Sequence, residues 1–283
     1  MTNRREFIAR SVAAGVAVAA VSALGAESVV ETDVTIKTED GSCDACFTHP
    51  ASGSHPGVLI WPDALGLRPV MRAMARRLAA EGYSVLVPNP FYRVSHAPQF
   101  ETAANLDFGD PALMTKLRPL MASVTGAGLA ERDARAYVAF LDSQRQVDRA
   151  RKIGTQGYCM GGPLVVRTAA VEPGRVGAAA SFHGGGLVTD QPNSPHLLAP
   201  RIKAQMYFAI AASDDERQPE AKTVLKDAFA KAGVSTEIDV YPARHGWCVA
   251  DMPIENGARI YDAMQAERAW SKLLALYKAA LAT

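Results

Sequence analysis

The chain has 283 residues, of which 48% are hydrophobic and 21% charged, and 30 Lys and Arg against 29 Asp and Glu give a formal net charge of +1. This balance argues against a duplex nucleic-acid binder, which needs a basic excess, and the hydrophobic content excludes disorder and a collagen-like repeat. Four cysteines in a chain of this length also exclude a disulfide scaffold. We therefore expect a folded protein with its own hydrophobic core.

The first 26 residues have the pattern of an export signal. Arg4 and Arg5 precede an apolar run from Val12 to Leu24, and small residues follow. Paired arginines before such a run are typical of twin-arginine signals, and about 13 residues are too few for a membrane span of roughly 20. We expect residues 1–26 to engage the twin-arginine export machinery and to direct the protein to the periplasm or the exterior. The alternatives are an uncleaved helix or a membrane anchor, and a protein without a working signal would be cytoplasmic.

The rest of the chain, residues 27–283, alternates short apolar runs with segments of helical period and is predicted to form one domain. We predict strands at residues 58–61, 83–87, 152–157, 177–182, 205–211 and 235–241, and helices at residues 69–82, 130–141, 163–171, 220–232 and 260–281. A hairpin or edge strand is expected to lead, over residues 34–37 and 43–47. Such alternation predicts an α/β fold, a mostly parallel doubly wound sheet flanked by helices.

Residues 92–128 are the irregular part of this pattern. They contain a helix start at Asp110–Pro111 and a stretch rich in Met and Leu that ends at Val124. Ligands of open parallel sheets bind outside the carboxyl ends of the strands, where long connections lie. The segment is either a lid over such a site or a solvent-facing insertion.

The sharpest local signal is Gly157-Tyr158-Cys159-Met160-Gly161-Gly162, between a predicted strand and a predicted helix. This is the pattern of a nucleophile elbow with cysteine in place of serine. The glycines allow a tight turn, and the helix N-terminus favours the thiolate over the thiol. The alternative is a small-residue turn that packs a buried, inert cysteine.

Two later loops supply the partners that a nucleophilic thiol needs. Asp214 and Asp215 follow the strand at residues 205–211, and His245 follows the strand at residues 235–241. The order nucleophile, acid, histidine is that of α/β-hydrolases. Taken singly, the aspartates could cap a helix and the histidine could bond only backbone groups.

Five motifs together resemble the dienelactone hydrolase family (carboxymethylenebutenolidase-like) of the α/β-hydrolase fold. They are Trp61-Pro62-Asp63-Ala64-Leu65-Gly66, Pro88-Asn89-Pro90-Phe91-Tyr92-Arg93, the elbow around Cys159, Ser181-Phe182-His183-Gly184-Gly185 and His245-Gly246-Trp247. The resemblance implies Cys159 as nucleophile, His245 as base and an aspartate after the sixth strand. Asp214 matches that aspartate best by its distance from the apolar run, whereas Asp215 keeps the better spacing to Pro219.

The resemblance also suggests the groups around the nucleophile. The amides of Met160 and Ala64 are expected to form the oxyanion hole. Asp63 stands where the family usually has a glutamate that holds the resting cysteine, although it could instead be a turn residue bonding local amides. Arg93 matches an arginine that grips a substrate carboxylate.

Other positions depart from the family or stay open. The second substrate arginine of the founding enzymes is replaced by Val249, which weakens the case for a carboxylated dienelactone. Trp247 is either a pocket wall or core. We read His183 as structural and leave it out of the site.

The favoured function is hydrolysis of a small ester or lactone through an acyl-cysteine, without a metal or an organic cofactor. The expected partner is the small-molecule substrate, and we expect a monomer. The alternative is a catalytically silent thiol redox-sensing or binding protein on the same scaffold. If the protein is exported, an oxidising compartment could close a bridge between Cys43 and Cys46 or couple Cys159 to Cys248, and a reversible Cys159–Cys248 bridge would favour this alternative.

Overall fold

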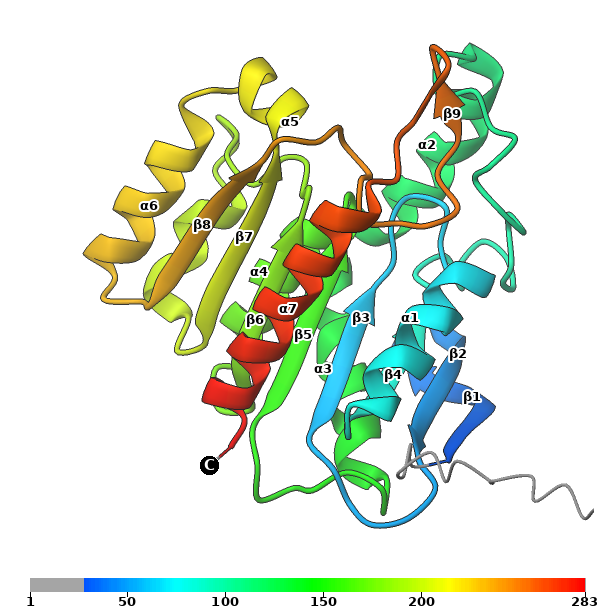
Figure 1. Ribbon diagram of the computed structural model, residues 1–283. Helices are drawn as coiled ribbons and strands as arrows, with labels where there is room; N and C mark the ends of the chain where they lie inside the picture. The colour runs from blue at the N-terminus through cyan, green and yellow to red at the C-terminus, as the bar shows by residue number, and fades with distance from the viewer. Residues whose placement is uncertain (1–27, 283) are drawn as a thin grey trace, which may run out of the picture.

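The computed structural model describes residues 28–282. Eight strands form one sheet in the order β1-β2-β4-β3-β5-β6-β7-β8, as Figure 1 shows in part. The strands are β1 Val29–Thr38, β2 Gly41–Pro50, β3 Gly57–Trp61, β4 Ser84–Pro88, β5 Ile153–Tyr158, β6 Val176–Phe182, β7 Gln205–Ala211 and β8 Thr236–Tyr241. The hairpin β1–β2 pairs antiparallel with β4, and the other pairs are parallel. The predicted α/β fold is confirmed.

The helices and short elements complete the molecule. They are α1 Pro69–Ala80, α2 Pro111–Thr125, α3 Leu129–Ser143, α4 Gly161–Val171, a 3-10 helix Pro195–Arg201, α5 Ala212–Arg217, α6 Ala221–Lys231, the hairpin β9 Ile254–Glu255 with β10 Ala258–Arg259, and α7 Ala263–Ala280. The predicted helix at 260–281 begins three residues later than expected, because the carboxylate of Asp262 caps it by accepting a hydrogen bond from the Gln265 amide. The short helix α5 and the β9–β10 hairpin were not predicted.

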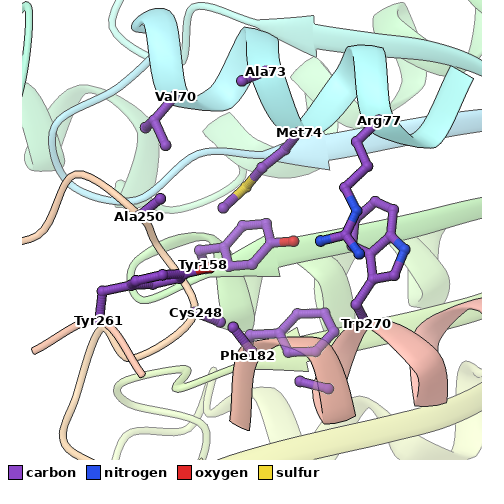
Figure 2. Close-up of a pocket in the computed structure, with 12 residues that line it drawn as sticks. Val70, Ala73, Met74, Arg77, Tyr158, Phe182, Cys248, Ala250, Tyr261 and Trp270 are labelled. Carbon is purple, nitrogen blue, oxygen red and sulfur yellow. The ribbon is translucent and has the colours of Figure 1, made fainter. Parts of the chain in front are cut away.

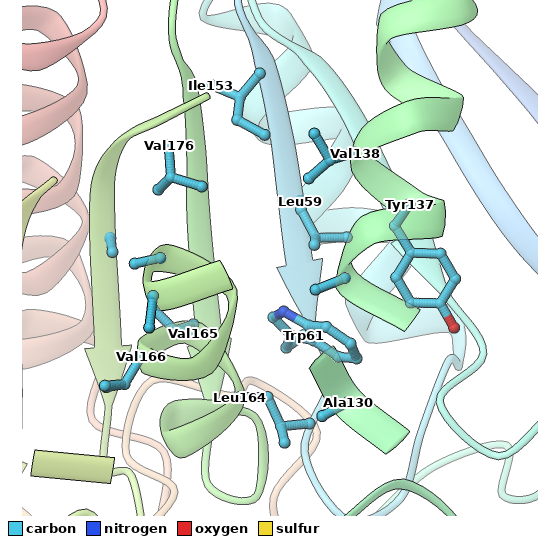
Figure 3. Packing of buried hydrophobic residues seen from close by; sticks show 14 of the residues in the cluster. Leu59, Trp61, Ala130, Tyr137, Val138, Ile153, Leu164, Val165, Val166 and Val176 are labelled. Atoms are coloured by element: carbon cyan, nitrogen blue, oxygen red, sulfur yellow. The ribbon is translucent and has the colours of Figure 1, made fainter. Parts of the chain in front are cut away.

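Helices cover both faces of the sheet, and the alternation of side chains along β3 explains why. Leu59 and Trp61 belong to the hydrophobic cluster that α3, α4 and α6 cover, whereas Val58 and Ile60 belong to the cluster that α1 and α7 cover. A strand buried on both faces is apolar at every position, as this one is. Figure 3 shows Leu59 and Trp61 against Tyr137 of α3, and the Trp61 indole donates a hydrogen bond of 2.9 Å to Thr168 of α4.

The irregular segment contains α2, and its other residues form turns and irregular backbone. Asp110 caps this helix through a hydrogen bond from the Ala112 amide, and Leu113 and Leu117 pack on Leu65 in a small cluster of their own. Figure 1 shows α2 and β9 beyond the carboxyl ends of the parallel strands. The segment therefore covers the edge of the sheet where a ligand is expected.

The predicted signal segment, residues 1–26, lies outside the described residues. Within residues 28–282, no helix combines the length and the apolar character that a membrane crossing requires.

Candidate active site

The turn between β5 and α4 presents Cys159 in a strained backbone conformation. Its φ is +51°, a left-handed value that a residue other than glycine rarely adopts. The flanking glycines are required by close approach: a Cβ on Gly157 would lie 2.3 Å from the Gly161 carbonyl oxygen, and one on Gly161 would lie 2.3 Å from the Trp61 carbonyl oxygen. The first turn of α4 is thereby held against the end of β3.

This close approach brings two backbone amides to the same site. Met160 precedes α4, and Ala64 lies in the turn after β3 and lines the same cavity as Cys159. Within residues 28–282, neither the Met160 amide nor the Ala64 amide donates a hydrogen bond to another protein group. Two free N–H groups beside a nucleophile are what an oxyanion hole requires.

His245 lies between an aspartate and the cysteine. Its Nδ1 is 2.7 Å from Asp214 Oδ2, and its backbone amide donates to the Ser213 hydroxyl over 2.9 Å. Asp215 instead accepts two hydrogen bonds of 2.7 Å from Lys222. Of the two candidate acids, the structure thus brings Asp214 to the histidine.

The electrostatics of the ring favour the imidazolium. Burial lowers the pKa of His245, but its interactions with Asp214 and Cys159 outweigh burial and raise that pKa from 6.5 to about 10. His245 and Cys159 line the same cavity. An imidazolium beside a sulfur favours the thiolate, which is the nucleophilic form.

The three side chains open into a cavity of about 560 Å³. Its walls are mostly apolar and come from the turn after β3, from α2 and from the chain around β9–β10. They are Leu65, Phe108, Met114, Leu117, Met121, Met252 and Ile260, with Arg217, Arg244 and Glu255 as the charged members besides the catalytic candidates and Asp63. The volume suits a small organic ligand.

Asp63 lines this cavity, but its carboxylate is engaged elsewhere. Arg68 donates to both oxygens, over 2.6 and 2.9 Å, and the Leu65 amide donates to Oδ1 over 2.9 Å. Within the described part of the chain, no hydrogen bond joins Asp63 to the Cys159 thiol. The turn interpretation of Asp63 therefore holds in part, and Arg68 is a partner that the sequence reasoning missed.

The expectation that Arg93 grips a substrate is contradicted. Its guanidinium donates to Asp133 over 2.7 and 2.8 Å, to Asp40 over 2.6 Å and to the Ser123 carbonyl over 3.1 Å, and it does not line the cavity. These partners accept hydrogen bonds from all three nitrogens of the guanidinium. Arg93 therefore holds α2, α3 and the β1–β2 turn together.

Trp247 and His183 are core residues. The Trp247 side chain is 0% exposed and stacks on Tyr241 at 4.9 Å, so the interpretation of Trp247 as a pocket wall is wrong. His183 is buried with its ring 4.8 Å from that of His245, and burial followed by the charge of His245 holds its pKa well below 6.5. His183 is thus a neutral support beneath the His245 ring.

The cysteine pairs of the redox alternative are not supported. Cys43 and Cys46 lie three positions apart on β2, so their side chains point to opposite faces, one toward Tyr137 and the other toward Thr48. Three residues of strand span roughly 10 Å, beyond the 7 Å limit for a disulfide. A Cys43–Cys46 bridge is therefore excluded in this fold.

Cys248 opens into a different cavity from Cys159. This second cavity, of about 170 Å³, lies between α1 and α7 and is lined by Tyr158, Phe182 and Cys248 (Figure 2). All four cysteines of the described chain are free thiols, and burial raises the pKa of the Cys248 thiol. The arrangement gives a Cys159–Cys248 bridge no support.

Comparisons with known proteins place this geometry in a family. The family model described as "Dienelactone hydrolase family" matches residues 43–281. The carboxymethylenebutenolidase of Rhodococcus opacus is 31% identical over 198 residues, which are 69% of this chain and 71% of that protein. Among solved structures, m3DLH covers 91% of this chain and 100% of its own at a TM-score of 0.72 and 24% identity. The dienelactone hydrolase of Anabaena variabilis ATCC 29413 covers 89% of this chain and 99% of its own at a TM-score of 0.59 and 17% identity. The chain therefore belongs to the dienelactone hydrolase family and is a hydrolase of the ester and lactone class, with an α/β-hydrolase fold.

Proposed function

We propose that the protein hydrolyses a small, uncharged carboxylic ester or lactone through an acyl-cysteine. The Cys159 sulfur attacks the carbonyl carbon, and its proton is held by His245. The carbonyl oxygen becomes an oxyanion that accepts hydrogen bonds from the Ala64 and Met160 amides. When the C–O bond breaks, the proton passes from His245 to the leaving oxygen, which departs as an alcohol or, in a lactone, stays attached to the acyl chain.

Water completes the cycle. It gives a proton to His245 and attacks the thioester carbon, so a second oxyanion forms at the same two amides. The C–S bond then breaks, the sulfur regains its proton and the carboxylic acid leaves. Asp214 keeps the Nδ1–H of His245 oriented throughout, which leaves Nε2 to exchange protons.

An uncharged substrate fits the walls of the cavity. The carboxylate-binding candidate Arg93 lies outside it, and the two arginines that line it are already paired. Arg217 lies 3.3 Å from Asp214, and Arg244 pairs with Glu255. The remaining walls are aliphatic, aromatic and methionine side chains, which favour an apolar acyl or alcohol group.

The proposal rests above all on one observation: His245 is hydrogen-bonded to Asp214 at 2.7 Å and lines the same cavity as Cys159. The test is hydrolysis of p-nitrophenyl acetate, butyrate and octanoate and of dihydrocoumarin by wild type, Cys159→Ala and Cys248→Ala. We expect Cys159→Ala to lose about 1000-fold or more in kcat and Cys248→Ala to keep wild-type rates. Mass spectrometry of the quenched reaction should find the acyl increment on the Cys159 peptide. Full turnover by Cys159→Ala would refute the proposal.

A further inference from the structure

Arg68 is a buried cation beside the active site whose donors are all used. The residue precedes α1 and is 1% exposed. Its guanidinium binds Asp63 through two hydrogen bonds of 2.6 and 2.9 Å and Asp251 through two of 2.8 and 2.9 Å, and the fifth N–H faces the Gly66 carbonyl at 3.4 Å. Two bidentate carboxylate pairs on one guanidinium fix its position and both partners closely.

The two carboxylates belong to different parts of the site. Asp63 belongs to the turn that carries the Ala64 amide, and Asp251 belongs to the loop after β8 that carries His245. Asp251 also accepts a hydrogen bond of 3.1 Å from the Ala103 amide, at the start of the connection into α2. Arg68 therefore joins the oxyanion turn, the histidine loop and the segment over the cavity.

Arg68 also sets the charge beside the nucleophile. Asp63 is 2% exposed and lines the same cavity as Cys159. A carboxylate near a thiol disfavours the thiolate, because like charges repel. Arg68 pairs with Asp63 on both oxygens and offsets that charge, so the cluster of Asp63, Arg68 and Asp251 carries a net charge of −1; without Arg68 it would carry −2.

We propose that Arg68 is a positioning residue of this active site: it offsets the charge of Asp63 in the cavity that Cys159 also lines, and it holds the Ala64 turn against the His245 loop. The inference rests on the proposed function for its effect on turnover. The effect of Arg68 on the Cys159 thiol is measured without turnover, so this inference and the proposed function can be refuted separately.

The first measurement is the rate of Cys159 alkylation by iodoacetamide as a function of pH. In Arg68→Met, the unpaired Asp63 carboxylate should slow alkylation at pH 7 by about tenfold or more, a shift of about one pH unit in the thiol midpoint. The double variant Asp63→Asn/Arg68→Met should return to within about twofold of wild type, because Asp251 alone then gives the cluster the same net charge of −1 that Asp63, Arg68 and Asp251 have together in wild type. Arg72→Met is the matched control, since Arg72 lies in the first turn of α1, four residues after Arg68, but pairs with Glu31 and Asp33.

The second measurement is kcat and KM for the best ester of the panel. Arg68→Lys keeps the positive charge, so we expect the alkylation rate of Cys159 to stay near that of wild type. Lysine cannot form the two bidentate pairs of the guanidinium, so we expect one oxyanion donor to be misplaced and kcat to fall by about 100-fold. The double variant should share this low kcat, while Arg72→Met should match wild type. A folded Arg68→Lys variant with wild-type kcat and KM would overturn the positioning role, even if Arg68→Met fails to fold. Equal alkylation by wild type and folded Arg68→Met would overturn the charge role. Absence of ester turnover in wild type would instead overturn the proposed function.

Discussion

Replacing Gly161 by alanine tests whether the contact between α4 and the end of β3 sets the rate of catalysis. The new Cβ would lie 2.3 Å from the Trp61 carbonyl oxygen and 2.8 Å from the Pro62 carbonyl oxygen, where ordinary contact begins at 3.4 Å. Neither backbone oxygen can turn aside as a flexible side chain would. The first turn of α4 must therefore move by about 1 Å from the turn that bears Ala64.

The effect on the rate follows from this displacement. A hydrogen bond of about 2.9 Å from the Met160 amide lengthens to roughly 3.9 Å, beyond the range of N–H···O bonds. Losing one oxyanion donor lowers kcat by about 100- to 1000-fold. Overpacking costs about 1–3 kcal/mol of folding free energy, which is less than the usual stability of about 5–15 kcal/mol, so the variant should fold.

The assay is kcat and KM on p-nitrophenyl butyrate, with circular dichroism melting to verify the fold and iodoacetamide to verify that Cys159 still reacts. Gly174→Ala is the matched control, because no heavy atom lies within 4 Å of its added Cβ; it should retain wild-type kinetics. A folded Gly161→Ala variant with wild-type kcat would show that the packing of α4 on β3 does not govern the oxyanion site.

Three further predictions concern charged residues. Asp214→Asn should lower kcat by about 10⁴-fold, whereas Asp215→Asn, which loses only its lysine partner, should keep kcat within about threefold, since exposed ion pairs contribute little. Because the pKa of His245 is raised from 6.5 to about 10, its imidazolium stabilises the fold fully below pH 6.5, and this stability is lost as pH rises to about 10. Asp214→Asn should lower that pKa and weaken the pH dependence, which NMR titration and melting curves at pH 6 and 10 can measure; an unchanged titration would contradict the pairing. Arg93→Gln leaves a buried carboxylate unpaired and should cost about 3–5 kcal/mol in urea unfolding while KM stays unchanged, and a raised KM in the folded variant would restore its substrate role.

Much of the fold could be predicted because its elements carry local signals. Val58 to Trp61 is apolar at every position, which indicates a strand covered on both faces, and Pro69 and Gly82 mark the limits of the first helix closely. Short elements such as α5 and β9–β10 escaped prediction, because their few residues contain no repeat of hydrophobicity. Their positions depend on contacts made after the sheet has formed.

Site residues could be predicted where their order along the chain indicates their role. They could not be predicted where their role depends on partners that are far away in the sequence. Cys159 and His245 each follow a strand in a recognisable turn, so their convergence could be expected from the topology. Arg93 looked available because nothing near it in sequence is acidic. Its partners Asp40 and Asp133 lie 53 and 40 positions away, and only the folded structure brings them to it. Arg68 went unnoticed although Asp63 is only five positions away, because its second partner, Asp251, lies 183 positions away and joins it only in the folded structure.

The walls of the larger cavity have a consequence for how this enzyme could diversify. Part of the cavity wall comes from α2 and from the chain around β9–β10, and these segments carry none of the candidate triad residues. Three of its contacts, Met114, Met121 and Met252, are unbranched thioethers that can rearrange around guests of different shape. Exchange of these two segments would change which substrates the cavity accepts, while the candidate catalytic residues keep the positions that the sheet gives them. The substrate selectivity of this scaffold could therefore be engineered without changing its catalytic residues.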